Sequence, residues 1–122
     1  MKIRNIAFTG YPVTDLQRAR DFYESVLGLV PSWINDKGED GAWIEYELGS
    51  GTFAISNIAK EWKPSPDGPS IAFEVEDFEG TIAELKAKQV VFGMDPFTTE
   101  VCRMALIADP DGNLVIIHKL HS

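Results

Sequence analysis

A repeated order of elements constrains this chain more than any other feature of its sequence. An apolar, β-favouring stretch at residues 3–10 leads into a capped helical pattern and then into strands, and the same order starts again at residue 70. The triplet Ile6-Ala7-Phe8 recurs as Ile71-Ala72-Phe73, each time just ahead of a helix cap. We therefore predict an α+β chain built from two copies of one strand, one helix and three strands.

The first copy is bounded by residues with strong backbone preferences. A glycine and a proline at residues 10–12 predict a turn after the first strand. Thr14 with Gln17 forms a capping-box pattern at the start of a helix, and Gly28 is the expected end of that helix. Strands are expected at residues 3–10, 33–34, 42–48 and 52–58, the last two joined by a glycine-rich hairpin turn.

The second copy follows a connector at residues 59–69, where three prolines disfavour regular structure. Asp77 is the expected cap of the second helix. Strands are expected at residues 70–76, 90–92, 101–108 and 114–119, and the Asp-Pro-Asp-Gly-Asn sequence at 109–113 predicts a tight turn. We expect a single domain over residues 1–122, with modules at 1–58 and 70–120.

The charge balance limits the partners of this chain. It carries 19 acidic and 11 basic side chains, a net charge of −8, and this field repels phosphate backbones and anionic membranes. We therefore expect neither nucleic acid nor membrane as a partner. No apolar run approaches the roughly 20 residues that cross a bilayer, and the first residues lack the apolar core of a signal peptide, so a cytoplasmic location is expected. One cysteine excludes an intrachain disulfide.

Two motifs, in the right order and spacing, carry a family resemblance over nearly the whole chain. The first runs from Pro12-Val13-Thr14-Asp15-Leu16 through Arg18-Ala19-Arg20-Asp21-Phe22-Tyr23-Glu24 to Val26-Leu27-Gly28-Leu29, and the second is Asp109-Pro110-Asp111-Gly112-Asn113. The chain resembles the vicinal oxygen chelate superfamily, which contains glyoxalases, extradiol dioxygenases, fosfomycin-resistance enzymes and bleomycin-binding proteins. The resemblance implies two βαβββ modules whose mixed sheets curl around a cleft, helices on the outside, and a homodimer.

In enzymes of this superfamily a divalent metal in the cleft polarises the substrate, and four strand positions supply its ligands. The resemblance maps these positions to Asn5 or Phe8, to Ser70, and to the neighbourhood of Ile55 and Ile116. Matching the Ile-Ala-Phe triplets favours Asn5 over Phe8, because it makes Asn5 the counterpart of Ser70. None of these side chains is a useful ligand for such an ion. We therefore expect no metal at this place and no other cofactor.

Acidic and histidine side chains offer another chemistry. Two-residue alternation along a strand places Ser70 and Glu74 on one face and Ile116 and His118 on one face. Glu74, Glu45 and His118 are therefore candidate catalytic residues, as an acid and base or as a displaced metal site. The alternative is that they are ordinary polar strand residues.

Aromatic residues suggest a binding surface instead. Trp33, Trp43 and Phe53 lie near Glu45 in the sequence, and rings beside a carboxylate suit a flat or cationic ligand. Arg103 favours the opposite kind of ligand, because an arginine in a cleft prefers a carboxylate or a phosphate. The predicted ligand-binding residues are Asn5, Trp33, Trp43, Glu45, Phe53, Ile55, Ser70, Glu74, Arg103, Ile116 and His118.

Two functional hypotheses follow from the sequence. The first is a small-molecule-binding protein of the bleomycin-resistance kind, which sequesters or senses a small aromatic or cationic compound without a metal. The alternative is a glyoxalase-like lyase or isomerase in which Glu74 or Glu45 is the general base, assisted by Arg103 or His118.

Overall fold

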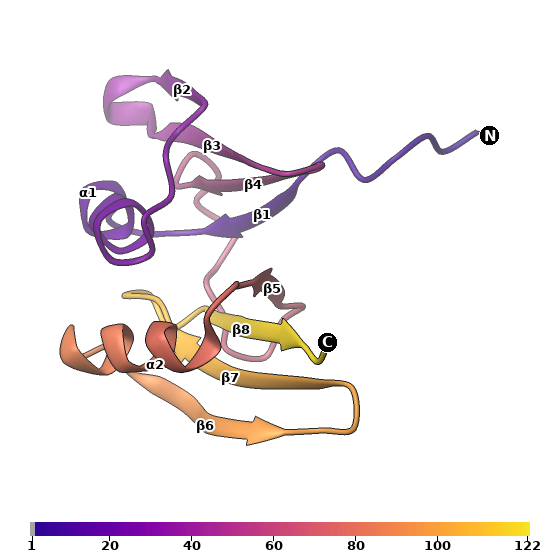
Figure 1. Cartoon of the computed structure of the whole chain (residues 1–122). Helices are drawn as coiled ribbons and strands as arrows, with labels where there is room; N and C mark the ends of the chain where they lie inside the picture. Colours follow the sequence, from indigo (N-terminus) through magenta and orange to yellow (C-terminus); the bar gives the residue numbers. More distant parts are fainter. Residues whose placement is uncertain (1) are drawn as a thin grey trace. The chain divides into compact units, whose positions relative to one another are not determined.

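The computed structural model describes residues 2–122 and resolves two compact units, one ending at Pro64 and the other beginning at Ser65 (Figure 1). Each unit contains one four-stranded mixed sheet and one helical segment. This confirms the predicted fold class, α+β with two βαβββ-type modules. Within residues 2–122, none of the helices has the length and apolar character required to span a bilayer.

In the first unit the sheet has the strand order β1-β4-β3-β2, with β1 parallel to β4 and the other neighbours antiparallel. Its elements are β1 (Thr9–Pro12), α1 (Leu16–Arg20), the π-helical continuation η1 (Asp21–Val26), β2 (Trp33–Asp36), the short 3₁₀ turn η2 (Gly38–Asp40), β3 (Ala42–Leu48) and β4 (Gly51–Ser56). The predicted hairpin at residues 42–58 is therefore confirmed.

Aromatic packing joins the helical segment to one face of this sheet. Phe53 on β4 lies 5.1 Å from the ring of Tyr23 on η1 and 5.4 Å from that of Tyr11 on β1. Tyr46 on β3 stacks on the same Phe53 ring at 6.2 Å. All four rings are at most 5% exposed. This face of the sheet, which we call the helix face, holds the core of the first unit.

The second unit repeats the arrangement with the strand order β5-β8-β7-β6, where β5 is parallel to β8. Its elements are β5 (Ile71–Glu74), α2 (Phe78–Ala87), β6 (Phe92–Thr98), β7 (Cys102–Ala108) and β8 (Leu114–Leu120). The buried side chains of α2 are Phe78, Ile82 and Leu85, and α2 contacts β8. The helix therefore covers the sheet face that carries the buried alternate residues of β7 and β8 (Figure 1).

Three predicted boundaries are wrong. The first strand begins at Thr9 and extends through Pro12, because residues 9–12 pair in parallel with β4 and the next amide, Val13 N–H, donates to the Ser56 carbonyl. The side chain that caps α1 is Asp15, which accepts from the backbone N–H of Arg18, instead of Thr14. Strand β6 runs over residues 92–98 instead of 90–92, since an edge strand tolerates Pro96 and the two register shifts on either side of Met94.

The register of the strands shows how the two modules correspond. Thr9 pairs with Phe53 and Ile71 pairs with Val115, so Ile71 follows Thr9 by 62 positions, as Val115 follows Phe53. The helix caps Asp15 and Asp77 keep the same spacing. The two modules are therefore related by an offset of 62 positions. The Ile-Ala-Phe triplets are 65 positions apart, so they are not equivalent in this alignment.

The offset of 62 positions shows that Asn5 and Ser70 are not equivalent, contrary to the expectation from the tripeptides. With the spacing set by the strands and the caps, the counterpart of Ser70 is Phe8. Asn5 precedes β1 and is exposed. The paired strands and helix caps thus define the relation between modules better than a short identical tripeptide does.

The turn before the last strand is built as its composition predicts. One carboxylate oxygen of Asp109 accepts from the backbone N–H groups of Asp111 and Asn113, both at 2.9 Å. The side-chain amide of Asn113 donates to the other oxygen. Gly112 has a φ of +86°, a left-handed conformation that favours glycine.

Candidate functional site

An aromatic surface covers the face of the first sheet opposite its helix face. Tyr46 and Ile44 point into the core, so alternation along β3 directs Trp43 and Glu45 to the other side. Trp33 on β2 is directly opposite Glu45 and shares that face. The ring of Phe8 meets the ring of Trp43 edge to face, with centroids 5.0 Å apart.

Gly10 brings a third tryptophan to this surface. A Cβ atom placed on Gly10 would lie 3.0 Å from Cη2 of Trp62 and 3.4 Å from the Phe8 ring. The absence of a side chain on β1 thus lets the connector residue Trp62 approach the strand closely. We call Phe8, Trp33, Trp43 and Trp62, together with Glu45, the aromatic face.

The rings of the aromatic face remain accessible to a ligand. Phe8 is 46% exposed, Trp33 52% and Trp62 38%. Glu45 and Trp43 are half-buried, and the indole Nε1–H of Trp43 donates to the Glu45 carboxylate at 2.8 Å. This bond fixes the carboxylate beside the ring. The arrangement combines the negative faces of the rings with a fixed negative charge, and both attract a cation.

A second polar group lies in the second unit. Glu74 on β5 is directly opposite His118 on β8, and one carboxylate oxygen lies 2.5 Å from Nδ1 of His118. The other oxygen accepts the backbone N–H of Leu120 at 2.8 Å. The Leu120 hydrogen bond, and then that of His118, lower the pKa of Glu74. Glu74 and His118 therefore share one face of the second sheet.

A half-buried ion pair is distinct from both groups. Arg20 binds the Glu24 carboxylate at 2.7 and 3.1 Å, and the hydroxyl of Tyr46 donates to the same carboxylate at 2.9 Å. Desolvation raises the pKa of Glu24, but the hydrogen bonds from Arg20 and Tyr46 outweigh it and lower that pKa overall. Desolvation by burial is the main reason that the pKa of Tyr46 is raised. These groups stabilise the first unit from within its helix face.

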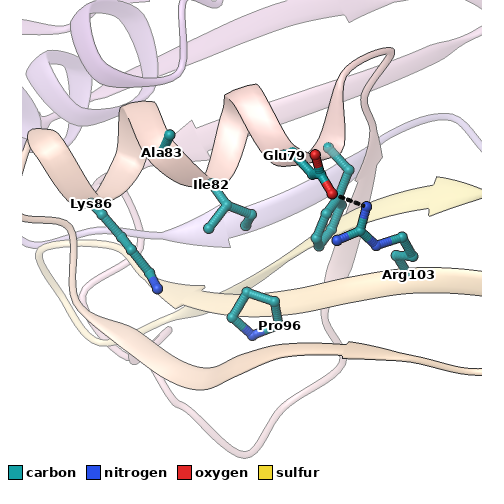
Figure 2. A pocket seen from close by; sticks show the side chains of 7 residues that line it. Glu79, Ile82, Ala83, Lys86, Pro96 and Arg103 are labelled. Carbon is teal, nitrogen blue, oxygen red and sulfur yellow. Dashed lines mark hydrogen bonds and ion pairs between the residues drawn. The ribbon is translucent and has the colours of Figure 1, made fainter.

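Several predicted ligand-binding residues lie elsewhere. Phe53 and Ile55 are buried in the core of the helix face, at no more than 1% exposure, because both are on the β4 face that packs against η1. Arg103 lies on the α2 side of the second sheet, with its guanidinium 4.6 Å above the Phe78 ring (Figure 2). His118 pairs with Met104, the next residue along β7, so Arg103 faces away from His118.

The positions that hold the metal in related enzymes do not fit one in this chain. By strand register the first position is Phe8, whose ring packs on Trp43, and Ile55 is in the core. Ser70 is exposed ahead of β5, and Ile116 offers only carbon atoms. Hard and borderline cations need converging oxygen, nitrogen or sulfur ligands. Across residues 2–122, no group of three or more His, Cys, Asp or Glu side chains is placed to hold a metal ion.

Two members of the aromatic face were missing from the predicted site. Trp62 belongs to the connector, where the sequence shows no periodicity that would place it beside a strand. Counting back from Asp15 did indicate Phe8, but the match of the repeated tripeptides favoured Asn5 in its place. Trp33, Trp43 and Glu45 were predicted, and the structure brings these three together on one face.

Comparison with known proteins agrees with this fold. Residues 5–117 match the sequence model of the Glyoxalase/Bleomycin resistance protein/Dioxygenase superfamily. The chain belongs to this superfamily. Membership covers both modules, and it confirms the resemblance on which the metal positions were mapped.

Proteins of similar sequence or structure align with nearly the whole chain. Uncharacterized protein YraH of Bacillus subtilis (strain 168) is 31% identical over 119 residues, which cover 88% of this chain and 92% of YraH. The crystal structure of TnmS3, an antibiotic binding protein from Streptomyces sp. CB03234, superposes with a TM-score of 0.81 at 22% identity and 99% coverage of both chains. The trypanothione-dependent glyoxalase I of Leishmania major gives a TM-score of 0.76 at 22% identity, over 96% of this chain and 87% of that chain. Binding proteins and enzymes thus share this fold, so the site must decide between them.

Proposed function

We propose that this protein binds a small planar compound carrying positive charge, and that it sequesters or senses that compound without changing it. The observation that supports this function is the aromatic face, where Trp33 and Trp43 lie beside the carboxylate of Glu45, and Phe8 and Trp62 extend the same side of the sheet. The net charge of −8 favours the approach of a cation.

Geometry explains why a flat ligand is preferred. Side chains that alternate along β3 present their rings on a surface, and a ring system can stack on such rings with loss of little conformational freedom. Trp43 is held by its own hydrogen bond to Glu45, so its orientation is set before the ligand arrives. A preorganised surface loses less entropy on binding than a mobile one.

Similarity to TnmS3 agrees with a binding role, because that protein is described as an antibiotic binding protein. At 22% identity the similarity supports the fold and leaves the ligand open. The homodimer implied by the superfamily and a cytoplasmic location are part of this proposal. Light scattering of the purified protein measures the first, and cell fractionation the second.

Calorimetric titration with matched bicyclic compounds tests the proposal. We expect 1-methylquinolinium, a planar cation, to bind more tightly than neutral quinoline, and 2-naphthoate to bind least. EDTA should leave the binding unchanged, and mass spectrometry should recover the compound intact. Equal affinity for the three compounds would contradict the proposal.

Removal of one ring from the aromatic face tests whether the ligand binds there. Trp43→Leu should weaken 1-methylquinolinium binding about fivefold, since a cation–π contact at a partly exposed site contributes about 1 kcal/mol. Phe92→Leu removes a ring from the second unit and is the matched control, with no expected change. If both variants bind alike, the aromatic face is not the site.

A second function, a glyoxalase-like lyase or isomerase, is favoured by one observation, the Glu74–His118 hydrogen bond. The lowered pKa of Glu74 makes its carboxylate a weak base at neutral pH. In such an enzyme the imidazole of His118 would take the proton, and Glu74 would orient the ring, as a carboxylate does in other dyads.

Deuterium exchange distinguishes this second function from the first. An enzyme of this kind should exchange the proton next to the carbonyl of a methylglyoxal–thiol adduct in D₂O, as followed by NMR. His118→Gln should abolish the exchange and Glu74→Gln should reduce it. No exchange above the rate of the buffer would exclude this function while leaving ligand binding unaffected.

A further inference from the structure

A pocket of about 290 Å³ lies between α2 and the strands β6 and β7 of the second unit (Figure 2). It is lined by Phe78, Glu79, Ile82, Ala83, Lys86, Pro96 and Arg103. All of these residues belong to the second unit, on the α2 side of its sheet. The pocket is therefore separate from the aromatic face and from the sheet face that carries Glu74 and His118.

The lining combines an apolar floor with two cations. Phe78, Ile82 and Pro96 supply hydrocarbon, and in Figure 2 Lys86 and Arg103 approach from the two ends of the pocket. Cζ of the Arg103 guanidinium lies 4.6 Å from the centre of the Phe78 ring, and the Lys86 ammonium lies 5.7 Å from the centre of the Phe92 ring. The contact with Phe78 restricts the position of the guanidinium, and a guanidinium can donate two parallel hydrogen bonds to a carboxylate.

A carboxylate from the protein already contacts this arginine. Glu79, in the first turn of α2, lies 3.3 Å from Nη1 of Arg103, yet its side chain is 81% exposed. An ion pair in this setting contributes about 0.2 to 1 kcal/mol, because water screens it and a long side chain must be held in place. A ligand carboxylate with an apolar body that enters the pocket can therefore replace it.

We propose that this pocket binds a small organic carboxylate with a compact apolar body, whose carboxylate replaces Glu79 on Arg103. The volume is at the lower end of the range for ligand pockets, which suits a body of one ring. The apolar floor favours a carboxylate of this kind over inorganic phosphate, which has no apolar surface to bury. Lys86 adds a second positive charge at the far end.

Glu24 in the first module corresponds to Lys86 in the second, because the two residues lie equally far beyond their helix caps, Asp15 and Asp77. Glu24 is satisfied internally by Arg20 and by the hydroxyl of Tyr46. Lys86 instead lies 5.7 Å from the centre of the Phe92 ring and lines the pocket. The two modules thus share the same arrangement of strands and helix and differ in the residue at this position.

Titration of ¹⁵N-labelled protein with benzoate tests the proposal. We expect backbone amide shifts in residues 78–86 and 97–104, no shift of the three tryptophan indole signals, and weaker binding of benzamide and inorganic phosphate. Arg103→Gln should reduce benzoate affinity at least about tenfold, as expected for loss of charge-assisted hydrogen bonds. Lys86→Gln should reduce it about twofold.

Removal of the competing carboxylate gives the sharpest result, because Glu79 is exposed and its loss should not impair folding. Glu79→Gln should strengthen benzoate binding about two- to fivefold. Glu84→Gln makes the same change of charge on α2, where Glu84 pairs with Lys88 at 3.2 Å, and should change the affinity less than twofold. Weaker binding in Glu79→Gln, equal gains in both variants, or binding of phosphate as tight as that of benzoate would overturn the proposal.

Discussion

The carboxylate of Glu45 is the one charged group fixed on the aromatic face, and Glu45→Gln removes its charge with little change of shape. Glutamine retains an oxygen that can accept the Trp43 indole N–H, which now lies 2.8 Å from the carboxylate. The variant should therefore fold normally and keep the rings in place. What it loses is the electrostatic attraction for a bound cation.

The size of that loss follows from the position of Glu45. A cation that stacks beside Trp43 would lie about 4 Å from the carboxylate, where two unit charges interact by about 1 kcal/mol in a water-like dielectric. Glu45 is half-buried, so this value is a lower estimate. We expect 1-methylquinolinium binding to fall at least about fivefold, and binding of neutral quinoline to stay the same.

Glu47→Gln is the matched control. Glu47 lies two residues along the same strand, about 6.6 Å further away, and its carboxylate accepts from the Thr52 hydroxyl. At that distance the interaction falls to about 0.4 of its value for Glu45 and salt screens much of the rest, so the expected change is less than twofold. Calorimetric titration at low and at physiological salt measures both variants. Equal losses in the two variants, or an equal loss for quinoline, would refute the assignment of Glu45.

Other predictions concern the groups that support the sites. The pKa of Glu24 is lowered in the folded protein, so its ionised carboxylate stabilises the fold above its ordinary pKa of 4.5. This stabilisation is lost as the pH falls below that value. Urea unfolding of Glu24→Gln should therefore show a weaker dependence on pH between 3 and 6 than that of the parent protein. Tyr46→Phe removes a buried donor to a carboxylate and should lower the free energy of unfolding by about 1 to 3 kcal/mol; a change below about 0.5 kcal/mol would mean that the bond contributes little. Gly10→Ala should displace Trp62, with a shift of its fluorescence and weaker binding of 1-methylquinolinium; an unchanged emission spectrum would show that the Trp62 contact is absent in solution.

Local chemistry explains why the architecture was predictable. The Asp109 turn depends on hydrogen bonds within five residues and on a glycine with positive φ, so its sequence is sufficient to specify it. Asp77 is likewise a cap that needs only its own helix. The order of strands and helices in both modules follows from such local signals.

Long-range contacts explain the errors. The start of β1 is set by pairing with β4, more than forty residues away, which the apolar run at residues 3–8 does not reveal. The capping error arose because Thr14 and Asp15 are both good caps by type, and only the backbone geometry decides between them. The extent of β6 depends on its place at the sheet edge, where Pro96 leaves no ladder hydrogen bond unmade.

The candidate site was predictable only in part. Alternation along β3 places Trp43 and Glu45 on one face, because a period of two needs no tertiary information. The contact between His118 and Glu74 depends in addition on the pairing of β5 with β8. Which face of a sheet receives the helix is a tertiary fact. For that reason Arg103 was predicted in the cleft, although it lies under α2.

The central claim is that the aromatic face of the first unit binds a planar cation. The indole N–H signals of Trp33, Trp43 and Trp62 report this face directly in a ¹H–¹⁵N spectrum. During titration with 1-methylquinolinium we expect all three signals to shift along one saturating curve, with the largest shift for Trp43, whose N–H contacts Glu45. Saturable shifts confined to amides of the second unit, with the three indole signals unmoved, would contradict the claim.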